Sequence, residues 1–373
     1  SFNNDGKLSH HASFYQPYSD EITTKITALY CATTHDVDNS EIDRAFSLDI
    51  ELAKLFAKAI EQFLQQEQLS HTDIIAIGNH GQTIRHRPLL AQPFTLQIGC
   101  CQTLATLTNI RVVGQFRRKD MALGGQGAPL VPAFHQTIFR ETASDDKLTT
   151  GCDVFVVNIG GITNITFLPA SKSLSVIGYD TGTGNALLDD WFKLHHPQCK
   201  HNYDKNGDWA AKGKLNPELL THLLADDYFQ LSPPKSTGRE YFNLPWLEKK
   251  LAHVTLDNTN LISAQDIQAT LAAFTAITLV DAIAQHHLAN EENKSTTKVY
   301  LCGGGVHNKY LKGLIDQQLK LHPKKYELLL TNQKGIDADQ LEAIAFAWFA
   351  FAYDKKLLSS MPAVTGASKS CTL

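Results

Sequence analysis

The stretch GYDTGTGNALLDDW, residues 178–191, carries an aspartate, Asp180, from an apolar run into a glycine-rich turn. Three interpretations of this carboxylate compete. Asp180 or Thr181 could cap the helix that the following residues predict. An Asp-Thr-Gly triplet also occurs in aspartic proteases, but their carboxylates act in pairs, and this chain has one such triplet followed by a helical pattern. We favour a general base beside phosphate-holding glycines, among them Gly182.

A second glycine turn lies in NIGGITNIT, residues 158–166, where Gly160 and Gly161 separate two strand-like runs. Glycines at this position let backbone N–H groups approach an anion, and Thr163 and Asn164 add side-chain donors. A plain β-hairpin turn would need the same two glycines. The stretch therefore predicts a phosphate loop only in combination with other turns of this kind.

A third turn, CGGGVHNKYLKGLI, reads as a strand, three glycines and a helix over residues 302–315. The first N–H groups of a helix and their partial positive charge suit a phosphate or the edge of a nucleotide. The sequence matches neither a Walker A loop nor the dinucleotide fingerprint, and a tight strand–helix turn is the alternative. The nucleotide-binding candidates here are Gly303, Gly304, Gly305 and Asn308.

Polar residues follow a buried strand in GNHGQTIRHRP, residues 78–88. Hydrogen-bonding side chains of this kind suit a polyol better than an apolar ligand. A metal site at His80 and His86 is disfavoured because no carboxylate or cysteine lies at ligand spacing, so no metal ligand is predicted. The predicted substrate-binding residues in this stretch are His80, Gln82 and Thr83.

Charged residues precede a glycine loop in GQFRRKDMALGGQGAPLVPAFHQ, residues 114–136. A guanidinium with a carboxylate could grip an acidic sugar or a phosphate in bidentate fashion. A solvated charged loop is the alternative, but such a loop would not need GGQG directly after it. We therefore add Arg118 and Asp120 to the predicted substrate-binding residues.

The composition narrows the possible partners. The 373 residues include 34 Lys+Arg and 38 Asp+Glu, a net charge of −4 without a basic stripe, which argues against a nucleic-acid partner. Seven scattered cysteines without a CxxC pair indicate reduced thiols and a cytoplasmic protein. The longest apolar run, within AIAFAWFAFAY, is shorter than the roughly 20 residues of a membrane span, so no membrane partner is predicted.

Strand-like and helix-like stretches alternate twice along the chain, which predicts an α/β protein with ligands at the carboxyl ends of strands. The polar stretch ETASDDKLTTG marks the domain boundary. We expect an N-terminal domain over residues 1–145, joined by residues 350–373, and a C-terminal nucleotide-binding domain over residues 146–350.

Taken together, the motifs resemble the anhydro-N-acetylmuramic acid kinases from about Tyr18 to Ala367. The resemblance rests on GNHGQTIRHRP, FRRKDMALGGQGAPLVPAFH, NIGGITNIT, GYDTGTGNALLDDW, STGREYFN, CGGGVHNKYL and EAIAFAWFA. It implies the two-domain fold of actin-like ATPases and sugar kinases, with ATP and Mg²⁺ in an interdomain cleft, and a homodimer. It also implies that the 1,6-anhydro ring is opened by water while O6 is phosphorylated, yielding N-acetylmuramate 6-phosphate for cell-wall recycling, with Asp180 as the base.

The chain departs from the family pattern at its start. Family members begin with a strand and a Gly-Thr-Ser-x-Asp-Gly phosphate loop, and this sequence shows neither; NNDGKL, residues 3–8, reads as a hairpin turn after the second strand. The alternatives are therefore a non-catalytic sugar or nucleotide sensor and, ranked below it, an ATP-switched scaffold. The role of Glu342, which could cap a helix or face the nucleotide, stays open.

Overall fold

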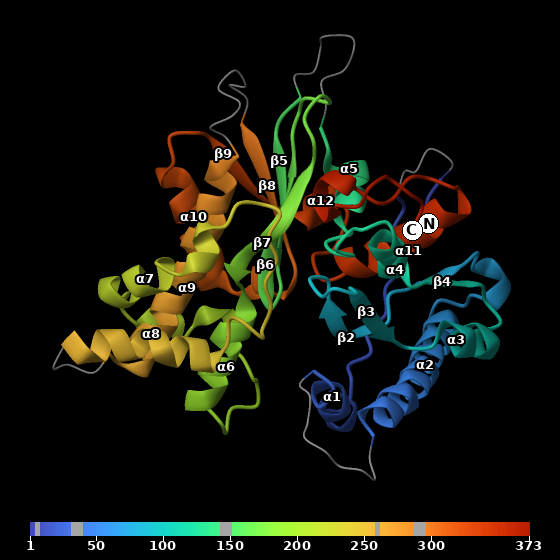
Figure 1. The fold of residues 1–373 in the computed structure, drawn as a ribbon, viewed down its shortest axis with the longest axis horizontal. Coiled ribbons are helices and arrows are strands. Elements are labelled where there is room, and N and C mark those ends of the chain that lie inside the picture. Colours follow the sequence, from blue (N-terminus) through green and yellow to red (C-terminus); the bar gives the residue numbers. More distant parts are fainter. Residues whose placement is uncertain (4–7, 31–39, 142–150, 258–261, 287–295) are drawn as a thin grey trace. The chain divides into compact units, whose positions relative to one another are not determined.

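The computed structural model describes residues 1–3, 8–30, 40–141, 151–257, 262–286 and 296–373, which form two compact units (Figure 1). Unit 1 comprises Ser1–Phe134 and Glu342–Leu373, and unit 2 comprises His135–Leu341. The predicted boundary at residue 145 lies outside the described residues. We describe each unit by itself, and the predicted domain limits and interdomain cleft stay predictions.

A five-stranded mixed sheet forms the centre of unit 2, in the order β7-β6-β5-β8-β9. The three consecutive strands β5, β6 and β7 pair antiparallel, whereas β8 and β9 run parallel to β5. The strands span Val154–Ile159 (β5), Ile162–Leu168 (β6), Ile177–Thr183 (β7), Thr297–Cys302 (β8) and Tyr326–Leu330 (β9). The Gly-Gly turn predicted between two strands is confirmed, because Gly160 and Gly161 join β5 to β6.

Helices complete unit 2, and most of them bury one apolar face. In α10, for example, Leu311, Ile315 and Leu319 recur every four residues and are buried. The helices of unit 2 are α6 (Asn185–His195), α7 (Pro217–Leu224), α8 (Leu244–Asp257), α9 (Ala264–Gln285) and α10 (Lys309–Leu321). Among the described residues α9 alone is long and apolar enough to cross a bilayer, but it is mostly buried against its neighbours, as expected of a core helix.

Unit 1 consists of two small sheets and helices. Strands β1 (Ile77–Asn79) and β4 (Val112–Gly114) pair parallel, and β2 (Gln82–Arg87) pairs antiparallel with β3 (Phe94–Ile98). Its helices are α1 (Asp20–Thr27), α2 (Glu41–Gln66), α3 (Cys101–Thr108), α4 (Phe116–Ala122) and α12 (Pro362–Thr365), while α5 (Pro132–Phe139) and α11 (Leu341–Asp354) contain the unit boundaries. Leucines and isoleucines of α1, α2, β2 and β3 form one core cluster.

Two polar stretches of unit 1 prove to be regular elements. The polar residues after His80 form strand β2, and the FRRKD stretch forms helix α4. At the amino end, Phe2 and Leu8 form an antiparallel bridge, as the predicted hairpin requires, although residues 4–7 between them lie outside the described residues. The helical form of FRRKD matters for the site, because consecutive helical residues point in different directions.

Candidate active site

Asp180 lies within strand β7, beside other polar residues of the sheet. In the antiparallel register Asp180 is opposite Asn164 of β6, and Asn164 is opposite Asn158 of β5. Residues directly opposite each other share one face of a sheet, so these three polar side chains form a row across three strands. The sequence interpretation placed Asp180 at a strand end, but β7 continues to Thr183.

A segment after α7 holds Asp180 in place. The backbone N–H of Thr237 donates to Oδ2 of Asp180 at 3.0 Å, and the hydroxyl of Tyr228 donates to the Asp180 carbonyl at 2.6 Å. The Asp180 N–H donates to the carbonyl of Lys235 at 3.2 Å. Burial raises the pKa of Asp180 to about 6, with a further increase from the charge of Glu240 and a partial decrease from the Thr237 hydrogen bond.

A carboxylate of this kind can act as a proton acceptor near neutral pH. Its Oδ1 atom makes no hydrogen bond within the described part of the chain, which leaves it available to a substrate or water. The capping interpretation is wrong, since the N-cap of α6 is Gly184 and no side chain caps that helix end. The geometry therefore favours the general-base interpretation among the three.

The Gly160–Gly161 turn abuts the start of α6. The carbonyl of Gly160 accepts from the N–H of Asn185 at 2.8 Å, and the carbonyl of Gly161 accepts from Gly184 and Ala186 at 3.0 and 3.1 Å. A β-carbon on Gly184 would lie 2.4 Å from the Gly160 carbonyl oxygen, so only glycine allows this approach. The turn is thus fixed with its carbonyl groups directed at the helix.

Threonines beside the turn serve the sheet. Thr163 is fully buried, and its hydroxyl donates to the carbonyl of Thr183 at 3.0 Å. The hydroxyl of Thr181 donates back to the carbonyl of Thr163 at 3.2 Å. Gly182 has a φ of +140°, and a β-carbon there would lie 2.9 Å from the ring of Phe229. The backbone conformation and the packing at this position therefore both favour glycine. Thr163 and Gly182, both predicted to bind nucleotide, hold β6 against β7 in this structure.

The three glycines after β8 have different surroundings. Gly303 has a φ of +79°, and a β-carbon there would lie 2.2 Å from Oδ1 of Asn158. A β-carbon on Gly305 would lie equally close to Ile159, whereas a β-carbon on Gly304 would lie 3.9 Å from its nearest neighbour, the side-chain nitrogen of Asn185. Asn308 caps α10 by accepting from the N–H of Leu311 at 3.0 Å. Of the three glycines, Gly304 is the one with open space beside it.

A cavity of about 410 Å³ lies in unit 1 and contains two of the five predicted sugar-binding residues, His80 and Arg118. Thr83 lies next to it, accepting from the side chain of Gln97, while Gln82 donates to the Tyr30 hydroxyl. The cavity is lined by Ala45, Phe46, Asp49, Asn79, His80, Gly81, Leu96, Gln97, Ile98, Gly99, Cys100, Cys101, Gln102, Gln115 and Arg118. Amide, carboxylate and guanidinium groups in one hollow suit a polyol.

Asp120 lies elsewhere in unit 1. It is fully buried, with Oδ2 accepting from the N–H of Gly127 at 2.8 Å and Oδ1 accepting from the hydroxyl of Thr365 at 2.7 Å. Both oxygens therefore hold the GGQG loop and α12 together. Asp120 was predicted to contact the substrate, but its geometry is that of a structural carboxylate.

Arg117, which sequence reasoning did not select, is the guanidinium next to His80. Its Nε donates to Nε2 of His80 at 3.0 Å and its Nη1 to the carbonyl of Gly127 at 2.8 Å. Burial, reinforced by the charge of Arg117, lowers the pKa of His80 to about 3, so the ring is neutral. Because Nε2 accepts, the proton lies on Nδ1. Burial lowers the pKa of Arg117, and the charge of Glu342 at the start of α11 opposes this decrease.

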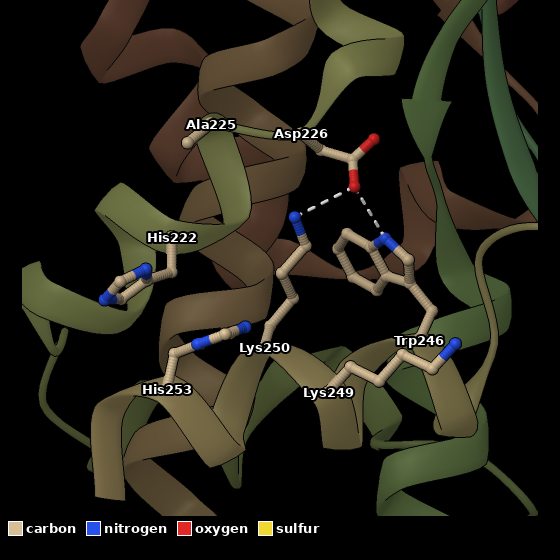
Figure 2. A pocket seen from close by; sticks show the side chains of 7 residues that line it. All are labelled: His222, Ala225, Asp226, Trp246, Lys249, Lys250 and His253. Carbon is tan, nitrogen blue, oxygen red and sulfur yellow. Dashed lines mark hydrogen bonds and ion pairs between the residues drawn. The ribbon is translucent and has the colours of Figure 1, made fainter. Parts of the chain in front are cut away.

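Asp226 supports Tyr228, which in turn holds Asp180. Figure 2 shows the contacts of the Asp226 carboxylate with Lys250 and Trp246. Its Oδ1 accepts from the Tyr241 hydroxyl and the Tyr228 N–H, and its Oδ2 accepts from Trp246 Nε1 and Lys250 Nζ. The pocket beside it, about 380 Å³, is lined by His222, Ala225, Asp226, Trp246, Lys249, Lys250 and His253. The quoted motif STGREYFN contains Tyr241, but nothing in the sequence indicated Asp226.

Comparison with known proteins settles the family. The profile described as anhydro-N-acetylmuramic acid kinase matches residues 2–373. The chain belongs to the anhydro-N-acetylmuramic acid kinase family.

Over the described residues no group of three or more histidine, cysteine or acidic side chains is placed to hold a metal ion.

Individual relatives agree with this assignment. The anhydro-N-acetylmuramic acid kinase of Colwellia psychrerythraea is 56% identical, over 97% of this chain and 88% of the relative. That of Mannheimia succiniciproducens is 43% identical, over 97% and 90%. A solved activator of 2-hydroxyisocaproyl-CoA dehydratase from Clostridium difficile with bound ADPNP shows 12% identity and a TM-score of 0.34 over 70% of this chain and 86% of its own.

Proposed function

We propose that this member of the family opens 1,6-anhydro-N-acetylmuramate with water and transfers the terminal phosphoryl group of ATP to O6, with Asp180 as the base. The family membership supports the substrate and the place in peptidoglycan recycling. The observation that carries the mechanism is the Asp180 carboxyl, whose pKa is about 6 and whose Oδ1 has no partner among the described residues.

The proposed step balances with one carboxylate. Asp180 takes a proton from water, the water oxygen bonds to C1, and the C1–O6 bond breaks. O6 bonds to the terminal phosphorus as the bond to ADP breaks, which gives N-acetylmuramate 6-phosphate. An inverting glycosidase needs a second carboxylic acid to protonate its leaving oxygen. Here the phosphoryl group takes that role, so a lone base suffices.

The chain offers groups for the nucleotide and its cation. The open space at Gly304 and the Gly160–Gly161 turn could receive phosphates. Mg²⁺ prefers oxygen donors, and the amide oxygen of Asn164, which is opposite Asp180 in the sheet, is of that kind, so we assign it to the cation. When bound, Mg²⁺ would neutralise phosphate charge.

In unit 1 the cavity at His80 and Arg118 is our proposed sugar pocket. The neutral His80 ring carries its proton on Nδ1 and forms part of the pocket wall. A homodimer and a cytoplasmic location remain proposals. The location is supported by Cys100, Cys101, Cys152, Cys199 and Cys371, which are reduced thiols.

Oxygen labelling tests the proposal. The full-length protein is incubated with ATP and 1,6-anhydro-N-acetylmuramate in H₂¹⁸O, and the product is analysed by mass spectrometry. We expect one ¹⁸O at C1 and none in the phosphate. Unlabelled product incubated in the same water controls for exchange at C1. Label in the phosphate, or sugar binding without ADP formation as in a sensor, would refute the proposal.

A further inference from the structure

Arg239 lies against the Gly160–Gly161 turn. A β-carbon placed on Gly161 would be 3.3 Å from Nε and 3.4 Å from Nη2 of Arg239, so the guanidinium covers the position where a side chain would stand. Arg239 makes no side-chain hydrogen bond or ion pair within the described part of the chain, although its side chain reaches back to the sheet. An arginine held at a glycine turn without a protein partner has donors to spare for a ligand.

The turn adds a second donor. Both of its carbonyl groups accept hydrogen bonds from the start of α6, and the N–H of Gly160 donates to the carbonyl of Ile162 at 3.2 Å. The N–H of Gly161 has no partner among the described residues. A guanidinium beside a free backbone N–H is a combination that binds phosphate oxygens.

The charge of Arg239 acts on the carboxyl group of Asp189 in α6. Asp189 does not neutralise the Arg239 guanidinium. No hydrogen bond or ion pair joins the two side chains. Burial raises the pKa of Asp189 to about 7, and the charge of Arg239 only partly offsets this. Asp190 and Asp204 raise the pKa further. Near neutral pH Asp189 is thus partly protonated, and the charge of Arg239 remains available.

Arg239 also belongs to the segment that positions the base. Thr237, two residues earlier, donates its N–H to Asp180, and Glu240, one residue later, contributes to the raised pKa of that carboxyl. One short segment therefore places a cation at the glycine turn and fixes the proton acceptor. Such a pairing suits a reaction in which water is deprotonated while negative charge moves on a phosphoryl group.

We propose that Arg239, together with the N–H of Gly161, binds the terminal phosphate of ATP and stabilises its charge during transfer to O6. The inference rests on the proposed function for the identity of the acceptor, but not for the nucleotide contact itself. Arg239 is then a catalytic residue, because it touches the phosphoryl group that is transferred.

The test compares nucleotides that differ by one phosphate. Affinities of the full-length protein for ADP and for β,γ-imido-ATP are measured with Mg²⁺ by calorimetry, in wild type, Arg239→Gln, Arg239→Lys and Lys193→Gln. Lys193 is an exposed cation of α6 and serves as the charge-matched control. Turnover of ATP with the anhydro sugar is measured on the same samples.

We expect Arg239→Gln to bind the ATP analogue about 10-fold or more weakly, the loss of a charge-assisted hydrogen bond, with ADP affinity within about twofold of wild type. Its kcat should fall about 10³-fold, as when an arginine that contacts the transferred phosphate is lost. Arg239→Lys should recover part of the analogue affinity, because it keeps the charge without the planar fork. Lys193→Gln should resemble wild type.

An equal loss of ADP and analogue affinity in Arg239→Gln, or an unchanged kcat, would overturn the inference. If wild type does not turn over the anhydro sugar but the analogue-specific loss is present, the proposed function fails and the phosphate contact stands. If turnover is normal and the analogue-specific loss is absent, the contact fails and the function stands. A wild type that binds neither nucleotide contradicts both.

Discussion

Asp180 and Asp226 lie in the same unit, are joined through Tyr228, and have opposite surroundings. Tyr228 donates its hydroxyl to the Asp180 carbonyl and its N–H to the Asp226 carboxylate. Asp226 accepts four hydrogen bonds, one of them from Lys250, whereas one N–H reaches the Asp180 carboxylate. Both oxygens of Asp226 are hydrogen-bonded within the protein, whereas Asp180 keeps one oxygen available to a ligand.

The difference determines the protonation of each group. Burial alone would raise the pKa of Asp226, but hydrogen bonds from Lys250, Trp246, Tyr241 and Tyr228 outweigh burial and leave it lowered. Burial raises the pKa of Asp180 to about 6 because the one hydrogen bond from Thr237 does not compensate. A saturated carboxylate thus stabilises the fold, while an under-satisfied one can exchange protons with a substrate.

The largest effect is expected from Asp180→Asn. We expect kcat to fall at least ~100-fold, since an amide cannot accept the proton from water. Nucleotide affinity, measured by calorimetry, should stay close to that of wild type. The exposed Asp227→Asn is the matched control and should leave kcat unchanged. Near-normal turnover by Asp180→Asn would remove Asp180 from the role of base.

The same variant should not lose stability. The pKa of Asp180 is higher in the folded than in the unfolded chain, so its contribution to stability is full below about 4 and is lost as the pH rises through about 6. At pH 8 the wild type therefore holds an unfavourable buried charge that Asp180→Asn lacks. Urea unfolding at pH 8 should show the variant at least as stable as wild type.

The opposite outcome is expected for Asp226→Asn. An amide there would turn an NH₂ group toward two of the four donors, leave Lys250 without its anion, and lower the free energy of unfolding by about 3 kcal/mol. Since the pKa of Asp226 is lowered, its contribution is present above about 4 and is lost at lower pH, so the gap to wild type should narrow there.

Chemical denaturation at several pH values measures this effect, with Asp227→Asn again as the control. A free energy of unfolding equal to that of wild type at pH 7 would show that the four hydrogen bonds do not stabilise the segment. A fall in kcat as large as that of Asp180→Asn, without a loss of stability, would contradict the division between a structural and a reactive carboxylate.

The fold was predictable where the sequence pattern is local. Strand-like runs on both sides of Gly160–Gly161 and the helix after Gly184 follow from β-branched spacing, glycine turns and apolar periodicity. Asp180 was found because a lone carboxylate among glycines needs an explanation. The row of Asn158, Asn164 and Asp180 needed the strand register, which the sequence does not supply.

The unit 1 residues show why other predictions failed. FRRKD was interpreted as charged residues ahead of a glycine loop, where a guanidinium and a carboxylate could grip one ligand. It is a helix, so Arg117 reaches His80, Arg118 lines the cavity, and Asp120 turns inward to Gly127 and Thr365. Thr365 is 245 residues from Asp120 in sequence, and no local pattern indicates such a contact.

The smallest effect concerns how the surroundings of Asp180 set its pKa. The ionised base is the active form, so kcat/KM should rise about tenfold per pH unit below a midpoint near 6 and level off above it. Because the charge of Glu240 raises this pKa, Glu240→Gln should move the midpoint down by less than one unit while kcat at pH 8 stays within about twofold of wild type. Initial rates from pH 4.5 to 8.5 measure both profiles, with the exposed Glu248→Gln as the control. A midpoint that Glu240→Gln moves upward would mean that the limiting group is not Asp180, because removal of a neighbouring anion can only favour ionisation of a carboxyl group.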